Sequence, residues 1–181
     1  MILNHKFTKE LLSDPICYRF PFSRICGCTI PCKIAIKEVS LNKITEGIYI
    51  GPIQQAYKKE ELLQANITHI INLSNMDYFT YDNFTYLNIS VMDNKYSDIS
   101  TYFDTTNEFI NSCLKNNSNK NILVHCYAGK SRSPTIIIAY LIKYQKMTLN
   151  ECYDLLNKKV EFLSINSGFM DQLKRYESEL K

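Results

Sequence analysis

The sequence predicts an α/β fold in which a central, mostly parallel sheet is flanked by helices. The first observation is the stretch from Asn121 to Ile142 (NILVHCYAGKSRSPTIIIAYLI), where a short apolar run, a polar bend and a long apolar run follow one another. This order is typical of a buried strand, a loop and a central helix. The second observation is that strand-like stretches alternate with helical ones along the chain, which is typical of a sheet with helices packed on it.

Two parts of the chain differ in composition. Residues 1–40 hold four of the seven cysteines and three of the five prolines, so we expect an N-terminal extension there and one folded domain over 41–181. The 45% of hydrophobic residues suffice for the core of such a domain. The spacing of the extension's cysteines fits no paired zinc knuckle, so we expect packing or redox-sensitive thiols rather than a zinc site. These cysteines are Cys17, Cys26, Cys28 and Cys32.

Charge and hydropathy argue against several function classes. The net charge of +3 is small and dispersed, which gives no argument for a nucleic-acid partner. No apolar run reaches the length of a membrane span, and the first residues lack the pattern of a secretory signal. An odd number of cysteines without an export signal predicts reduced thiols and hence a cytoplasmic protein, with import into the nucleus left open.

The first half of the domain contains three predicted strands. Gly47 to Pro52 forms a short strand closed by a turn, and a helix follows over 54–64. Ile67 to Leu73 has the pattern of a buried strand. The third strand is predicted from Tyr86 to Val91, after a polar and aromatic loop at 78–84.

The second half of the domain is mainly helical apart from its central strand. A polar loop from Met92 to Ser100 leads into apolar residues at helical spacing, which predict a helix over 99–114. Beyond the central helix, Thr148 and Glu151 form a capping-box pattern that begins another helix. The last helix is predicted over 169–180.

The bend between the central strand and helix has the features of an anion site. The first turn of a helix presents unpaired backbone N–H groups and a partial positive charge. Arg132 adds a planar set of donors that can grip two phosphate oxygens at once. The same field favours a thiolate at Cys126. A nucleophile and a phosphate cradle therefore coincide.

This combination suits the two-step hydrolysis of a phosphate monoester. We expect Cys126 to attack phosphorus and form a cysteinyl-phosphate, which Ser133 would help to break down by donating its hydroxyl hydrogen to the sulfur. His125 would order the loop, without acting as a general base. The chemistry as predicted needs no metal or other cofactor. The expected phosphate-binding residues are Tyr127, Ala128, Gly129, Lys130, Ser131 and Arg132.

The acid for the leaving alcohol must come from outside the loop, which contains no carboxylate. Asp93 follows the strand predicted over 86–91 and would project from its end. Asp98 precedes the next helix and suits an N-cap. We therefore expect Asp93 to be the general acid.

These residues resemble the signature of the cysteine-dependent protein phosphatases, His-Cys-x5-Arg-Ser/Thr, which is present here as HCYAGKSRS. The longer resemblance is to the dual-specificity phosphatases. It spans about 42–180 and includes GIYIG, ITHIINLS, VMDNKYSDISTYF and NSGFMDQLKRYE. The resemblance implies the cysteine-phosphatase fold, metal-free hydrolysis, and activity on phosphotyrosine and on phosphoserine or phosphothreonine of proteins.

The resemblance also assigns residues by position. It implies Cys126 as nucleophile, Arg132 as phosphate binder, Asp93 as general acid and Ser133 as the hydroxyl that assists the second step, whereas Asp98 falls on a position that is usually structural. There are two departures from the family pattern. An isoleucine, residue 165, stands where a proline commonly precedes the asparagine of the last loop, and the cysteine-rich extension has no counterpart.

Two other functions stay open at this point. Lys130 in the loop is a feature shared with lipid phosphatases of the same superfamily, so a phosphoinositide or phospholipid phosphatase is one alternative. A module that binds phosphoproteins without turnover is the other, although such modules usually lack the cysteine that is present here. Phosphorylated proteins are the expected partners, with a MAP-kinase-type phosphoprotein as one candidate.

Overall fold

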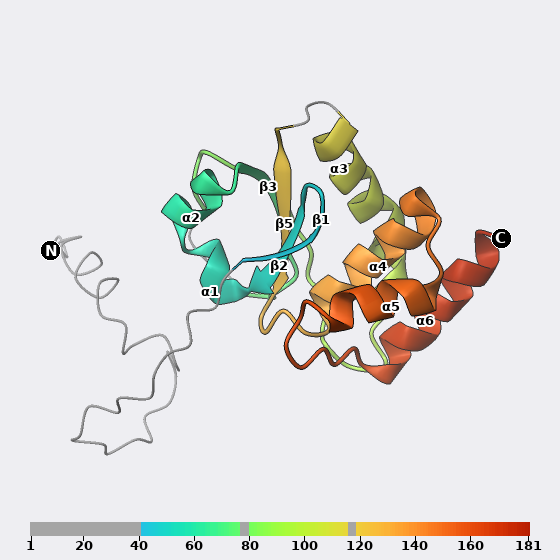
Figure 1. Cartoon of the computed structure of the whole chain (residues 1–181). Coiled ribbons are helices and arrows are strands. Elements are labelled where there is room, and N and C mark those ends of the chain that lie inside the picture. The colour runs from blue at the N-terminus through green and yellow to red at the C-terminus, as the bar shows by residue number, and fades with distance from the viewer. Residues whose placement is uncertain (1–40, 77–79, 116–118) are drawn as a thin grey trace, which may run out of the picture. The chain divides into compact units, whose positions relative to one another are not determined.

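A five-stranded sheet forms the centre of the fold (Figure 1). The computed structural model describes residues 41–76, 80–115 and 119–181, and the predicted extension over 1–40, with its four cysteines, lies outside them. β1 runs antiparallel to β2, while the pairs β2·β5, β5·β3 and β3·β4 are parallel, which confirms the mostly parallel sheet. The strands are β1 (Asn42–Thr45), β2 (Ile48–Pro52), β3 (Ile67–Asn72), β4 (Thr85–Asn88) and β5 (Asn121–Cys126), in the spatial order β1-β2-β5-β3-β4.

Helices cover both faces of this sheet (Figure 1). On one face, α1 and α2 pack through Ala56 and Leu62 against Ile70 and Leu123. The other face carries the larger core, in which α4, buried from Arg132 to Ile142, lies among α3, α5, α6 and the sheet. No helix of the described part of the chain combines the length and apolar character needed to cross a membrane. The helices are α1 (Ile53–Ala56), α2 (Lys59–Gln64), α3 (Phe103–Lys115), α4 (Arg132–Gln145), α5 (Leu149–Asn157) and α6 (Ser167–Glu179), with a short 3-10 turn, η2 (Ser100–Tyr102), before α3.

Helix starts in the second half follow local sequence signals. The capping box at α5 is confirmed, since Thr148 Oγ1 accepts a hydrogen bond from Glu151 N (3.3 Å) and Glu151 Oε2 accepts one from Thr148 N (2.7 Å). Pro134 lies in the first turn of α4, as predicted. The last helix begins earlier than predicted, at Ser167, because the side chain of Asn166 caps it by accepting from Phe169 N.

Two predicted elements are wrong in extent. The single helix predicted over 54–64 is two short helices, because the carbonyl of Tyr57 accepts hydrogen bonds from Lys59 N and Tyr81 Oη and the helix stops there. The strand predicted from Tyr86 to Val91 runs from Thr85 to Asn88, and the next residue, Ile89, donates its N–H to Asn72 O at the end of β3. β1, which pairs with β2, was not among the predicted strands.

Gln55 in α1 provides a first prediction, about stability. Its side chain is fully buried, and neither amide atom has a hydrogen-bond partner among the described residues. Because a buried unpaired amide is costly, we expect Gln55→Met, which has a similar volume, to raise the free energy of unfolding by about 1–2 kcal/mol in urea denaturation. The exposed neighbour provides a control, since Gln54→Met should change it little. A loss of stability in Gln55→Met would show that the amide is satisfied in solution.

Candidate active site

The loop that joins β5 to α4 is held against the start of α1. Ile53 N donates a hydrogen bond to Tyr127 O (3.2 Å). Gly129 has a positive φ of 72°, and a Cβ at this position would lie only 2.9 Å from the carbonyl carbon of Gly51. The loop therefore requires glycine at 129 for its backbone conformation and for its packing on β2.

Cys126 is the last residue of β5 and lies under this loop. Its side chain is buried, and its Sγ accepts hydrogen bonds from Gly129 N (3.2 Å) and Ser133 Oγ (3.3 Å). Cys126 also shortly precedes α4 in the sequence, and the N-terminus of a helix carries a partial positive charge. These groups would stabilise negative charge on the sulfur, both before attack and when it leaves phosphorus.

The loop ends at Ser131, the N-cap residue of α4, and at Arg132, its first residue. Arg132 is buried, and its Nη1 donates hydrogen bonds to the carbonyls of Leu73 (2.7 Å) and Val91 (3.3 Å). Its Nε has no hydrogen-bond partner among the described residues. The guanidinium is therefore fixed through its Nη1 by the carbonyls of two segments, while its Nε makes no hydrogen bond to a described residue.

Asp93 also reaches this loop. Its Oδ1 accepts hydrogen bonds from Ser131 Oγ (2.7 Å) and Asn166 Nδ2 (2.8 Å), and its Oδ2 lies 3.7 Å from Arg132 Nε. The other candidate carboxylate, Asp98, has a different place, because its Oδ1 accepts from Ser100 N (3.0 Å) and Ser100 Oγ (2.6 Å) at the start of η2. Of the two aspartates, Asp93 is thus the one that contacts Ser131 and Arg132 of the loop.

His125 precedes the cysteine and is completely buried. Burial lowers the pKa of its imidazole to about 4, against a smaller opposing effect of a hydrogen bond with the backbone of Cys126. The ring is therefore neutral near pH 7, which suits a residue that orders the loop.

The lowered pKa of His125 gives a prediction for stability against pH. An unfolded histidine with a pKa of about 6.5 binds more protons than the folded one between pH 4 and 6.5, so stability rises with pH over this window and falls as the solution is acidified. We expect the free energy of unfolding to drop by about 3 kcal/mol from pH 6.5 to 4 through this residue. Denaturation of His125→Gln at several pH values should show a shallower drop. A residual slope is expected from His69, whose pKa is also lowered by burial, whereas equal slopes in both proteins would contradict the assignment.

Lys130 and two aromatic side chains line the outside of the loop. Lys130 Nζ lies 5.1 Å from the ring centroid of Phe162, and Lys130 O accepts a hydrogen bond from Ser164 N (3.0 Å). Phe162 is 73% exposed with a positive φ of 57°, and Tyr127 is 47% exposed. A positive φ is uncommon for a bulky residue. At Phe162 it accompanies a cation–π contact between the ring and Lys130 Nζ.

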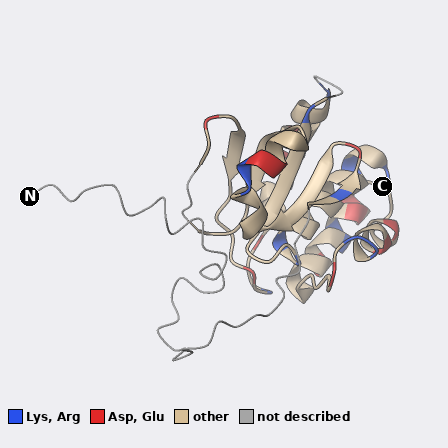
Figure 2. Cartoon of the chain, turned by 60° about the vertical axis from the view of Figure 1, so that its left-hand side comes forward, with Lys and Arg blue, Asp and Glu red and all other residues tan. Residues whose placement is uncertain are grey.

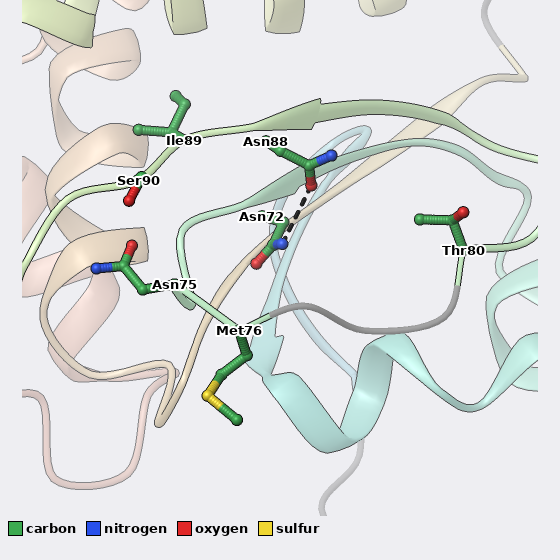
Figure 3. Close-up of a pocket in the computed structure, with 7 residues that line it drawn as sticks. All are labelled: Asn72, Asn75, Met76, Thr80, Asn88, Ile89 and Ser90. Atoms are coloured by element: carbon green, nitrogen blue, oxygen red, sulfur yellow. Dashed lines mark hydrogen bonds between the residues drawn. The ribbon is translucent and has the colours of Figure 1, made fainter.

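A polar pocket of about 310 Å³ opens where β3 and β4 end (Figure 3). Asn72 Nδ2 donates a hydrogen bond to Asn88 Oδ1 (3.1 Å) inside it. Among the described residues, its lining contains no His, Cys, Asp, Glu, Lys or Arg side chain. The lining residues are Asn72, Asn75, Met76, Thr80, Asn88, Ile89 and Ser90.

In the described part of the chain, charged side chains form no second cluster. Acidic and basic residues alternate over the ribbon rather than gathering in one place (Figure 2). Within 41–76, 80–115 and 119–181, no group of three or more His, Cys, Asp or Glu residues is arranged to hold a metal ion. The loop at Cys126 therefore stands as the candidate active site.

Asn166 contacts Asp93 and was not among the predicted site residues. Its position before an apolar helix is a recognisable N-cap signal, and this signal predicts the bond from its side chain to Phe169 N. The second bond of the same amide, to Asp93, joins residues 73 positions apart and depends on the fold.

Comparisons with known proteins agree with this geometry. Residues 48–179 match the family model described as the dual specificity phosphatase catalytic domain. MAP kinase phosphatase with leucine-rich repeats protein 3 of Dictyostelium discoideum is 36% identical over 181 residues, which cover 98% of this chain and 20% of that protein. Dual specificity protein phosphatase 1B of Arabidopsis thaliana is 34% identical over 142 residues, which cover 78% of this chain and 84% of that protein.

Solved structures show the same similarity. A crystal structure of DUSP15 superposes with a TM-score of 0.73 at 30% identity, covering 76% of this chain and 87% of that one. The human tyrosine phosphatase-like serine/threonine/tyrosine-interacting protein superposes with a TM-score of 0.72, also at 30% identity, covering 77% of this chain and 97% of that one. The described fold is thus shared with proteins of this class over most of their length.

Proposed function

Because the chain belongs to the dual specificity phosphatase family, we propose that the loop from Cys126 to Arg132 is its catalytic phosphate-binding site. The enzyme removes phosphate from phosphotyrosine and from phosphoserine or phosphothreonine of proteins, by the two-step cysteine mechanism of the family. One observation carries the residue assignment. The sulfur of Cys126, the guanidinium of Arg132 and the carboxylate of Asp93, which lies 3.7 Å from Arg132 Nε, are gathered around a single loop.

In the first step, the Cys126 thiolate attacks phosphorus, so that an S–P bond forms while the bond from phosphorus to the substrate oxygen breaks. The leaving oxygen takes a proton from Asp93. Arg132 and the backbone N–H groups of the loop bind the three other phosphate oxygens, whose charge changes in the transition state. The Leu73 and Val91 carbonyls keep the guanidinium in place throughout.

In the second step, water attacks phosphorus and the S–P bond breaks. Asp93, now a carboxylate, takes a proton from the water, and inorganic phosphate is released. Ser133 supports this step, because its hydroxyl lies 3.3 Å from the sulfur and can donate a hydrogen bond to the departing thiolate. The enzyme returns to its starting state without a metal ion taking part.

Phosphoproteins are the substrates of this family, and we propose a MAP-kinase-type phosphoprotein as the substrate class. The proposal is supported by the relative from Dictyostelium discoideum, which is called a MAP kinase phosphatase and matches along nearly all of this chain. A cytoplasmic site of action is part of the proposal, because catalysis requires Cys126 as a reduced thiol.

A comparison of protein and lipid substrates tests this function, and a variant of Lys130 tests whether this residue helps to bind them. We expect purified, EDTA-treated protein to hydrolyse phosphotyrosine and phosphothreonine peptides faster than inositol phospholipids in vesicles. Lys130→Gln should raise KM for an acidic phosphopeptide by about 3- to 10-fold and leave kcat nearly unchanged, because it removes a charge from the outer side of the loop and not a reacting group. The control is Lys115→Gln, an exposed lysine at the end of α3. Faster turnover of the lipid, lost selectively in Lys130→Gln, would contradict a protein substrate.

A further inference from the structure

The two oxygens of the Asp93 carboxylate have different surroundings. Oδ1 accepts hydrogen bonds from Ser131 Oγ and Asn166 Nδ2, at 2.7 and 2.8 Å, whereas Oδ2 lies beside the Nε of Arg132 at 3.7 Å. An amide N–H can only donate, so a proton on Oδ1 would be opposed by the amino group of Asn166. Oδ2 is therefore the oxygen suited to carry a transferable proton, on the side of the guanidinium that would bind phosphate.

The orientation of the Asn166 amide is determined by its second partner. Its Oδ1 accepts a hydrogen bond from Phe169 N (3.0 Å) as the N-cap of α6, so its Nδ2 must be the atom that faces Asp93. The backbone N–H of Asn166 in turn donates to Ser131 Oγ (3.3 Å). Through these hydrogen bonds, Asn166 links the N-termini of α4 and α6 to Asp93 Oδ1.

The same helix holds the chain that follows Asp93. Gln172 is buried, its Oε1 accepts from Ile99 N and Ser100 N at 2.9 Å each, and its Nε2 donates to Ser97 O (2.9 Å). The backbone at Lys95 lies directly against Gly168, where a Cβ would overlap the Lys95 carbonyl. The first turns of α6 therefore determine the course of residues 93–100.

A third amide side chain holds the segment before Asp93. Asn75 Oδ1 accepts a hydrogen bond from Val91 N (2.9 Å), and Asn75 lies at the edge of the pocket that Figure 3 shows. Val91 O is also one of the two carbonyls that hold Arg132. The chain is thus held on both sides of Asp93.

We propose that Asn166 and Ser131 are positioning residues that fix Asp93 with Oδ1 occupied and Oδ2 free to deliver the proton to the leaving group. The inference rests on the proposed role of Asp93 as general acid. Under this proposal, efficient catalysis requires an N–H donor at position 166 in addition to the carboxylate of Asp93. Removing this donor should impair proton delivery and leave phosphate binding intact.

Asn166→Asp tests this requirement, because an aspartate keeps the shape of the side chain and the oxygen that caps α6 but has no N–H for Asp93. For a phosphoserine peptide, whose leaving alkoxide needs a proton, we expect kcat to fall about 10- to 100-fold with KM nearly unchanged. For an aryl phosphate with a good leaving group, the loss should be several-fold smaller. Asn150→Asp, exposed in the first turn of α5, serves as the matched control.

A double-variant cycle separates positioning from a general structural effect. In protein that already carries Asp93→Ala, adding Asn166→Asp should change kcat by less than about twofold, because the group that it positions is absent. Equal losses in the presence and absence of Asp93, or full kcat in Asn166→Asp, would overturn the inference. Asn166→Ser, which also keeps a capping oxygen, provides a second variant if the first does not fold. Failure of the proposed acid itself would appear separately, as an unchanged rate in Asp93→Ala.

Discussion

Cys126→Ser is expected to lower kcat for phosphotyrosine peptides by more than about 10⁴-fold, while the peptides still bind. The reason is that an alcohol is not ionised near neutral pH, so the attacking group is lost, whereas Arg132 and the backbone N–H groups of the loop are retained. Steady-state turnover gives kcat, and titration of the variant with the same phosphopeptide gives Kd.

The other described cysteines provide controls for this prediction. Cys152 is fully buried, and burial raises the pKa of its thiol to about 12. Burial also raises the pKa of Cys113. Neither thiol is suited to attack a phosphate, so Cys113→Ser and Cys152→Ser should keep nearly full kcat when folded. Normal turnover in Cys126→Ser, or its loss in folded Cys152→Ser, would be incompatible with Cys126 as nucleophile.

Asp93→Ala is expected to lower kcat by about 10²- to 10³-fold for a phosphoserine peptide and to leave KM within about threefold. The variant lacks the proton donor for the leaving oxygen, but the groups that bind phosphate are intact. The loss should shrink for aryl phosphates whose leaving group needs no proton. Measuring kcat for a series of aryl phosphates with different leaving groups tests this dependence.

Asp98→Ala is the matched control, since Asp98 binds the start of η2 rather than the loop. It should lower stability, through loss of the two hydrogen bonds from Ser100, with little change in kcat at temperatures where the protein is folded. If Asp98→Ala produced the dependence on leaving group and Asp93→Ala did not, the roles of the two carboxylates would have to be exchanged.

Local signals explain why much of the centre of the fold could be predicted. The apolar runs on either side of Cys126 indicate a strand and a helix by length and pattern, and Pro134 marks the first turn of that helix. Asp93 follows a strand and Asp98 precedes a helix, and these local features distinguish the two carboxylates in the sequence. The capping box at Thr148 is a third example. In each of these cases the residues that determine the structure lie within a few positions of one another.

The contacts that could not be predicted join distant parts of the chain. Arg132 is held by Leu73 O, 59 residues away, and Asp93 is held by Asn166, 73 residues away. The break between α1 and α2 at Tyr57 depends in the same way on Tyr81, which follows β3 and is 24 residues away in the sequence. No periodicity or local motif encodes such pairs, because each depends on how the strands and helices pack.

Identification of a phosphorylated intermediate tests the central claim most directly. Ser133→Ala is the protein of choice, because without the hydroxyl 3.3 Å from the sulfur the cysteinyl-phosphate should break down more slowly and accumulate. The variant is mixed with a phosphorylated substrate and the reaction is rapidly quenched. Peptide mapping by mass spectrometry should then find one phosphoryl group on Cys126, and none in the double variant that also carries Cys126→Ser. Phosphate release with no modified Cys126, or a phosphoryl group on another residue, would contradict the mechanism.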